Sequence, residues 1–286
     1  MIEKVQIKTA LCDARLADEL QSAKSDSILE QILLFGESEL EKMMSGKPEI
    51  FENFPTAADD TCLIAFTSGT TGQPKGTMHF QRDMLTICRA YSGAGTGSNS
   101  GRPLYRQSSA GVHIWFGRTT AFSDVHPCFD NFTGIGNSGF APSCNQKHQA
   151  SIVFTSPTAY RFLLAKLQDG DLSSVRTCVS AGETLPKPTW DSWKEKTGLE
   201  ILDGIGSTEL LHIFMSSRSD DIRPGSTGKP LEGYQAKVVD DSGNEVPPGT
   251  TGKLAVRGPT GCRYLAAASS RLSLCCSKVL PEMQHS

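Results

Sequence analysis

One short segment combines glycines, hydroxyl side chains and a cation directly after an apolar run. Residues 67–76 read T-S-G-T-T-G-Q-P-K-G and follow the run T-C-L-I-A-F at residues 61–66. Glycines let backbone N–H groups converge on an anion, hydroxyls add donors, and a lysine supplies a point charge. The segment therefore predicts a phosphate-binding loop in which Lys75 contacts phosphoryl oxygens. From composition alone, a polar surface turn is an equal alternative.

The spacing of this loop excludes the P-loop of ATPases, in which glycine directly precedes the lysine. Here Pro74 occupies that position. The sequence also lacks a G-x-S-x-G nucleophile motif before a helix and any zinc-ligand spacing. Phosphate chemistry is thus better supported than a serine-hydrolase or zinc mechanism.

A second candidate is Glu209, a lone carboxylate after Gly204 and Gly206. Mg²⁺ takes few protein oxygens and shares phosphate oxygens with a nucleotide, so one carboxylate suits it. Thr208 can donate to the same phosphate. Taken alone, Glu209 reads as a solvated loop carboxylate, and His212 reads as a buried core histidine; only their neighbours favour functional roles.

Alternating strands and helices must position these groups. Periodicity predicts helices at 13–24, 158–167 and 188–196, and strands at 61–66, 150–154, 175–179 and 200–202, the last leading into a glycine loop at 204–206. Residues 234–239, 241–244 and 253–257 read as strand, turn and strand. This order predicts an α/β fold with a parallel-rich sheet flanked by helices and a C-terminal β-hairpin region.

Composition narrows the class of protein. The 286 residues carry a net charge of −3 with basic residues spread along the chain, which indicates neither a nucleic-acid nor an anionic-membrane partner. We find no secretory signal and no stretch of membrane-spanning length. Nine scattered cysteines without a C-x-x-C pair predict reduced thiols in a cytoplasmic protein.

The string S-G-T-T-G-Q-P-K-G resembles the phosphate loop of the adenylate-forming superfamily, which includes acyl-CoA synthetases, luciferases and peptide-synthetase adenylation domains. S-A-G-E from Ser180, D-G-I-G-S-T-E from Asp203 and S-T-G-K-P from Ser226 follow in the family's order. The resemblance implies ATP/AMP, Mg²⁺ on Glu209 and coenzyme A, with Lys75, Thr208 and Glu209 as catalytic groups. It implies that the nucleotide is held by Thr67, Ser68, Gly69, Thr70, Thr71, Gly72, Lys75, Ser180, Ala181, Gly182, Glu183, Asp203, Gly204, Ile205, Gly206, Ser207 and Thr208.

The string S-T-E-L-L-H-I-F from Ser207 resembles the benzoate and 2-aminobenzoate branch of CoA ligases. That resemblance implies an aromatic carboxylic acid bordered by His212 and Ile213, with Ala181 and Gly206 leaving space for a flat ring. Residues 154–161 resemble the same branch. In another branch, such as the fatty-acid ligases, His212 would not face the substrate.

The resemblance covers residues 1–91 and 148–265. It implies a partial AMP-binding domain at 1–265, an irregular stretch at 93–147 and an aberrant tail at 266–286. Back-translated and read one nucleotide later, residues 104–127 permit a string that resembles the family's missing strand and glycine-rich loop. We interpret this stretch as out of frame, in preference to a divergent insert, because structureless segments of this length are uncommon in compact domains.

The family's ribose-binding aspartate and lysine-bearing C-terminal domain have no counterpart in these 286 residues. The sequence therefore predicts a marginally stable aryl-CoA ligase fragment without turnover. Two alternatives stay open, a nucleotide-binding module without ligase activity and a translation product without a ligand.

Overall fold

The computed structural model describes residues 1–35, 39–48, 50–67, 74–91, 104–106, 151–167, 172–265 and 278–283. The chain divides into two compact units. The smaller unit is Met1–Thr56 with Gly69–Pro74 and Ala266–Ser270, and the larger unit is Ala57–Ser68, Lys75–Leu265 and Arg271–Ser286. All predicted site residues from Lys75 onward belong to the larger unit.

The smaller unit combines two parallel strands with short helices. Strand β1 (Thr9–Asp13) pairs with β2 (Gln31–Phe35), and the helical elements are α1 (Ile2–Val5), the 3-10 turn η1 (Ala14–Leu16), α2 (Ala17–Ser25) and α3 (Glu39–Ser45). The helix predicted at 13–24 is confirmed for most of its length. It starts later because Asp13 stays extended and its carboxylate accepts the Arg15 N–H at 3.0 Å, which caps η1.

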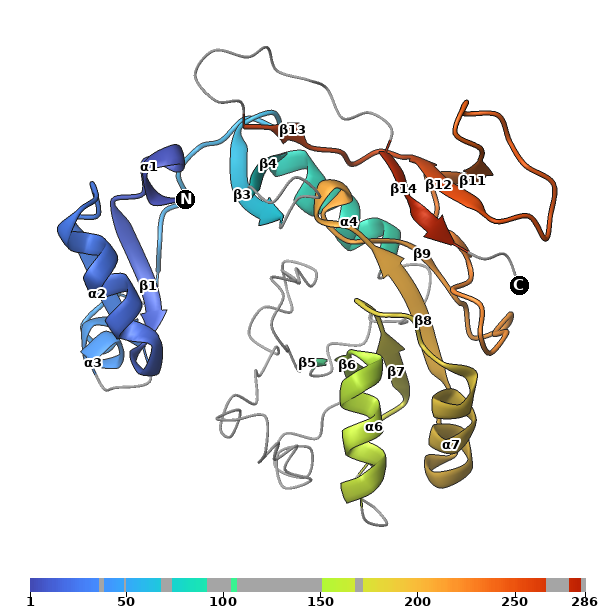
Figure 1. Cartoon of the computed structure of the whole chain (residues 1–286). Helices are drawn as coiled ribbons and strands as arrows, with labels where there is room; N and C mark the ends of the chain where they lie inside the picture. Colours follow the sequence, from blue (N-terminus) through green and yellow to red (C-terminus); the bar gives the residue numbers. More distant parts are fainter. Residues whose placement is uncertain are drawn as a thin grey trace. The chain divides into compact units, whose positions relative to one another are not determined.

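A six-stranded sheet forms the centre of the larger unit, in the order β10-β9-β8-β7-β6-β5. Strands β5 (Leu104–Arg106), β6 (Ile152–Thr155), β7 (Thr177–Ser180) and β8 (Ile201–Gly206) are parallel. Strands β9 (Ile213–Ser216) and β10 (Lys229–Pro230) continue the sheet antiparallel. The predicted parallel-rich sheet is confirmed, and its strands β6 to β9 can be followed in Figure 1.

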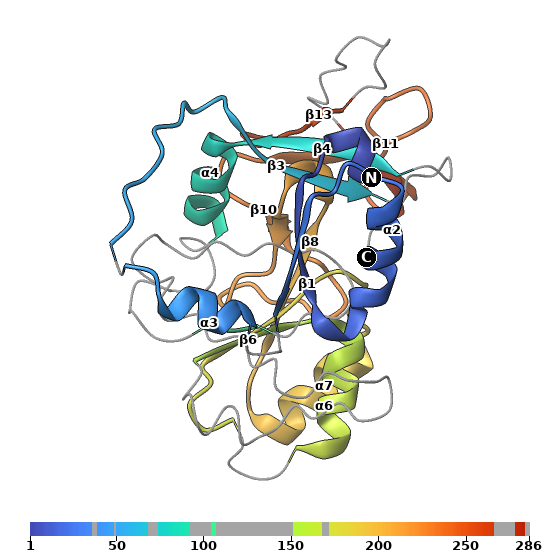
Figure 2. The ribbon, with the colours of Figure 1, turned by 90° about the vertical axis from the view of Figure 1, so that its left-hand side faces the viewer.

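The two faces of this sheet bury different apolar clusters, since successive strand residues point to opposite faces. Val153 lies with α6 (Pro157–Lys166) and α7 (Lys187–Thr197), where the Tyr160 and Trp193 rings meet edge-on at 4.7 Å. These two helices run side by side in Figures 1 and 2. Phe154 belongs to the other cluster, whose buried members include Ala90, Tyr91, Ile152, Val179, Leu202, Leu210, Ile213, Phe214, Leu254 and Val256.

Local signals account for the ends of both helices. Ser156 precedes α6, and its hydroxyl accepts the Ala159 N–H at 3.3 Å while Pro157 occupies the first turn. Helix α7 ends at Gly198, which adopts a left-handed φ of 72°. The helices predicted at 158–167 and 188–196 are therefore confirmed.

An antiparallel hairpin precedes α4 (Gln81–Tyr91) and corrects one prediction. Strand β3 (Thr61–Thr67) pairs with β4 (Lys75–Phe80), and Thr67 lies opposite Lys75. The loop predicted at 67–76 is thus too long at both ends, because the pairing places Thr67, Lys75 and Gly76 in strands. Strand β13 (Arg263–Tyr264) adds to the other edge of β4.

A second small sheet contains β11 (Gln235–Val239), β12 (Gly252–Arg257) and β14 (Lys278–Met283). The hairpin of β11 and β12 confirms the prediction for this region. Strand β14 lies within the stretch 266–286, where the sequence shows no pattern. This strand pairs with β12, a partner that local sequence does not reveal. Likewise β5 lies inside 93–147; the rest of that stretch, up to 147, lies outside the described residues, so its out-of-frame interpretation stays a prediction.

Within the described part of the chain, helices are too short or too polar to cross a bilayer.

Candidate functional site

The carboxyl ends of three parallel strands form one side of the candidate site. Thr155 on β6 is in register with Ser180 on β7, and Ser180 is in register with Asp203 on β8. All three side chains are buried. Ligands of open parallel sheets bind beyond the carboxyl ends of the strands, and the predicted segment from Ser180 to Glu183 leaves the sheet there.

Residues of that segment differ in exposure. Ser180 is buried, Ala181 is half-buried, and Gly182 has a left-handed φ of 94°. Glu183 is exposed, and its carboxylate accepts a hydrogen bond of 2.6 Å from the Thr158 hydroxyl at the start of α6. The segment is thus a turn that exposes backbone groups next to the strand ends.

Asp203 is the buried carboxyl of this row, with 8% of its surface exposed. Burial raises the pKa of Asp203 to about 7, and the Ser180 hydroxyl and the Gly204 N–H lower it only in part. Near neutral pH the group is therefore partly protonated, so it can donate as well as accept a hydrogen bond.

The glycine loop predicted at 204–206 is wrong, because these residues extend β8. Gly204 pairs with Ser216, Ile205 with Met215, and Gly206 with Ile213, with an irregularity in register between Ile205 and Gly206. A Cβ atom on Gly206 would lie 2.6 Å from the His212 carbonyl oxygen. Glycine is therefore required here by the close approach of two backbones, whether or not a substrate ring lies nearby.

Glu209 lies in the 3-10 turn η4 (Thr208–Leu210), which follows β8 directly. The Ser207 hydroxyl accepts the Leu210 N–H at 3.3 Å and caps this turn. Only 6% of Glu209 is exposed, and its Oε1 accepts a hydrogen bond of 3.1 Å from the Tyr264 hydroxyl. Lys75 Nζ lies 5.9 Å from the centroid of the Tyr264 ring. The predicted phosphate lysine and metal carboxylate thus both lie next to one tyrosine, Lys75 over its ring and Glu209 at its hydroxyl.

The predicted substrate residues lie beside the second apolar cluster. Ile213 is buried in it, and the half-buried Ala181 and Ile205 pack against it. His212 is half-buried, and its ring meets Tyr91 edge-on at 5.1 Å. The structure therefore brings these residues to the same end of the sheet as Asp203.

The predicted phosphate loop lies only partly within the described residues. Ser68, Gly69, Thr70, Thr71 and Gly72 lie outside the described residues. Thr67 and Lys75 flank them as paired strand residues, with Lys75 exposed.

The donor chemistry of Glu209 fits Mg²⁺. In the parts of the chain that the structure describes, no three His, Cys, Asp or Glu side chains gather as a metal cluster. A transition-metal cage is therefore not seen there, whereas Mg²⁺ is commonly held by one or two carboxylates together with substrate phosphates. Glu209 has the required hard oxygen atoms in a fixed orientation.

Comparison with known proteins decides the family. The model of the AMP-binding enzyme family matches residues 1–264. The chain belongs to the AMP-binding enzyme family. It is 34% identical over 234 residues to a benzoate–CoA ligase of Thauera aromatica, covering 79% of this chain and 44% of that protein. It is 35% identical over 212 residues to an anthranilate–CoA ligase of Pseudomonas aeruginosa, covering 72% of this chain and 39% of that protein.

Solved structures agree with this AMP-binding assignment. The anthranilate CoA ligase AuaEII in complex with anthranoyl-AMP superposes with a TM-score of 0.76 at 29% identity, covering 94% of this chain and 54% of that one. A benzoate CoA ligase from Burkholderia xenovorans shares the fold, with a TM-score of 0.69 at 22% identity over 92% of this chain and 53% of that one. The chain thus spans about half or less of the relatives it matches.

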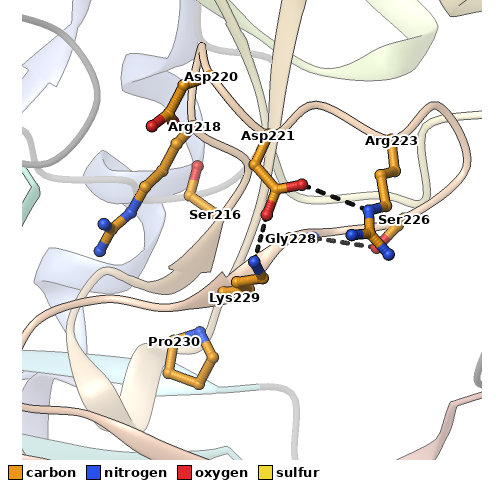
Figure 3. Close-up of a pocket in the computed structure, with 9 residues that line it drawn as sticks. All are labelled: Ser216, Arg218, Asp220, Asp221, Arg223, Ser226, Gly228, Lys229 and Pro230. Carbon is orange, nitrogen blue, oxygen red and sulfur yellow. Dashed lines mark hydrogen bonds and ion pairs between the residues drawn. The ribbon is translucent and has the colours of Figure 1, made fainter.

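The fourth family-like segment, from Ser226 to Pro230, contributes four residues to the lining of a hollow of about 380 Å³, which the chain connecting β9 to β10 completes. In Figure 3 the Asp221 carboxylate pairs with both Lys229 and Arg223. A Cβ atom on Gly228 would lie 2.2 Å from the Ser216 backbone. The lining of this hollow includes none of the predicted nucleotide-binding residues, and Lys229 and Pro230 of the segment pair with Ser216 and Met215 of β9.

Three residues at the site were missed from the sequence: Tyr264, His79 and Tyr91. His79 is four residues after Lys75 on β4, and alternate residues of a strand share a face. This spacing was the sequence feature that could have pointed to His79. Tyr264 and Tyr91 gave no local signal, because their contacts depend on strand pairing and on the packing of α4.

Proposed function

We propose that this chain carries the MgATP-binding and aromatic-acid-binding part of an AMP-forming aryl-CoA ligase. The observation that carries the proposal is the arrangement of Lys75, Tyr264 and Glu209. A cation and a buried carboxylate from distant segments meet at one side chain, beside strand ends suited to ligand binding.

In the proposed reaction an oxygen of the acid's carboxylate attacks the α-phosphorus of ATP. The P–O bond to pyrophosphate breaks, which yields acyl-AMP. The sulfur of coenzyme A then attacks the acyl carbon, and AMP leaves. Catalysis of both steps rests on positioning and charge neutralisation.

Each proposed role follows from the chemistry of its group. Lys75 offsets negative charge on the β- and γ-phosphates, and the Thr208 hydroxyl donates to the α-phosphate. Bound Mg²⁺ would supply charge neutralisation at the phosphate oxygens, held by Glu209. We assign Asp203, whose pKa is raised, and the backbone after Ser180 to hydrogen bonds with the nucleotide base.

The proposed acid is an aromatic carboxylate of the benzoate or 2-aminobenzoate type. Two relatives that bear these substrate names are each at least 34% identical to the chain. Ala181, Gly206, His212 and Ile213 would border the ring. The apolar surroundings of Ile213 and the edge of the His212 ring suit a flat aromatic group.

We expect these 286 residues, assayed by themselves, to bind MgATP weakly and to form no aryl-CoA. The direct test is ligand-observed NMR of ATP with and without Mg²⁺, combined with assays for pyrophosphate and thioester using benzoate, 2-aminobenzoate and octanoate. Mg²⁺-stimulated ATP binding is the expected result.

Two results would redirect the proposal. A complete lack of ATP binding would overturn it. Tight ATP binding without any thioester would favour a nucleotide-binding module. This module is the second candidate because the chain covers only 39% to 44% of the length of the two ligases.

A further inference from the structure

The His79 side chain on β4 is fully buried and contacts the turn η4. Its Nε2 lies 2.7 Å from the carbonyl oxygen of Thr208, a residue 129 positions away. A carbonyl oxygen only accepts hydrogen bonds, so the proton of this contact belongs to His79 Nε2. The histidine therefore tethers the backbone of the residue that precedes Glu209.

Asp83 borders the other side of the same ring. Its Oδ2 lies 3.8 Å from His79 Nδ1, too far for a hydrogen bond, and only 1% of the residue is exposed. The same Oδ2 accepts the Phe80 N–H at 3.0 Å at the start of α4. The ring of His79 is thus confined between a fixed carboxylate and the Thr208 carbonyl.

Tyr264 provides a second tether to the next residue of the turn. It pairs with Thr77 on β4, two residues before His79, and its hydroxyl donates to Glu209. Lys75 begins the same strand and shares a face with His79, about 13 Å along the strand. Strand β4 and its neighbour β13 therefore carry the proposed phosphate lysine and both contacts to the turn.

Backbone hydrogen bonds close the turn itself, from the Leu210 N–H to the Ser207 carbonyl and from the Leu211 N–H to the Thr208 carbonyl. Its three residues are followed by Leu211, a non-glycine residue with a left-handed φ of 72°. Backbone in that region persists when surrounding structure holds it in place. The Thr208 carbonyl accepts the Leu211 N–H at 3.2 Å as well as His79, so both of its lone pairs are engaged.

A buried histidine often serves packing alone. Here the partner of the histidine is the backbone of Thr208, whose hydroxyl is proposed to donate a hydrogen bond to phosphate. An independent contact from Tyr264 reaches Glu209, the proposed metal ligand. We propose that His79 and Tyr264 are positioning residues that hold Thr208 and Glu209 in the geometry that MgATP requires. This inference rests on the proposed function. Residues that orient a metal ligand typically change metal affinity by about 10-fold to 100-fold when they are replaced.

The test compares ATP binding in Mg²⁺ with ATP binding in EDTA, measured on the whole chain by ligand-observed NMR. Tyr264→Phe removes one hydroxyl and keeps the ring beside Lys75, whereas His79→Leu removes the imidazole donor. Both variants should lower affinity for MgATP about tenfold or more, and should lower Mg²⁺-free ATP binding much less. His79→Gln keeps an N–H donor and should restore most of the loss.

Tyr160→Phe is the matched control, since its buried hydroxyl bonds the Val153 and Val179 carbonyls away from the turn. It should lower the melting temperature and leave the Mg²⁺ dependence unchanged. If His79→Leu does not fold, Tyr264→Phe decides. Equal weakening with and without Mg²⁺, or no change in either variant, would overturn the positioning role. Absence of Mg²⁺-stimulated binding in the wild-type chain would instead overturn the proposed function itself.

Discussion

The Tyr264 hydroxyl donates a hydrogen bond of 3.1 Å to Glu209 Oε1. The two residues come from β13 and from the turn after β8, and 55 positions separate them. Only 6% of Glu209 is exposed, so its carboxylate has little room to turn, and this bond sets its direction. The carboxylate is oriented before any cation arrives, which lowers the cost of ordering it on binding.

Glu209→Gln keeps the size of the side chain and removes its charge. We expect affinity for MgATP to fall at least about tenfold, while binding of Mg²⁺-free ATP stays as in the wild type. Titrations in Mg²⁺ and in EDTA measure the difference. Glu232→Gln, at an exposed position, serves as the control and should behave as wild type. A Glu209 variant that still responds to Mg²⁺ would exclude this carboxylate as the metal ligand.

Gly206→Ala places a Cβ atom 2.6 Å from the His212 carbonyl oxygen. Backbone atoms of a paired strand cannot easily move, so we expect the free energy of unfolding to drop by about 1–3 kcal/mol. Gly46→Ala is the control, because a Cβ atom there would meet nothing within 4 Å. Urea unfolding curves of both variants check the prediction. Equal stabilities would mean that β8 and β9 are farther apart than described.

Trp193→Ala empties the core between the sheet and helices α6 and α7. The indole is fully buried and meets the Tyr160 ring at 4.7 Å, so its removal should cost about 3–5 kcal/mol of unfolding free energy. Phe162→Ala, at a side chain with 52% exposure on α6, should cost far less. Chemical denaturation followed by circular dichroism gives both values, and similar losses would contradict the described core.

Asp203 should make folding stability depend on pH. Its pKa is raised from 3.8 to about 7 by burial, so its contribution is fully present below pH 3.8 and is lost as pH rises through about 7. The loss is on the order of 4 kcal/mol. Asp203→Asn does not ionise and should show a flatter profile between pH 4 and 8. Unfolding free energies measured across this pH interval test the prediction. Asp220→Asn, at an exposed position, is the control and should keep the pH dependence of the wild type.

Local patterns predicted several elements well. Apolar periodicity, together with the helix stop at Gly198, predicted helices α6 and α7 and strands β3, β6, β7, β11 and β12. Predictions failed where partners far along the chain decide the structure. Thr67, Lys75 and the stretch 204–206 look like loop because of their glycines and polar side chains, yet strand pairing makes them extended.

The sequence by itself determined the family, the chemistry of the candidate groups and the parallel α/β order, because these depend on residue types and short spacings. It predicted Lys75, Thr208 and Glu209 as candidate groups but not how they are held. Only the tertiary structure joined Lys75 to Glu209 through Tyr264 and placed His79 against Thr208. Such contacts depend on the register of β4 with β13 and on the packing of the turn after β8, which short-range patterns do not encode.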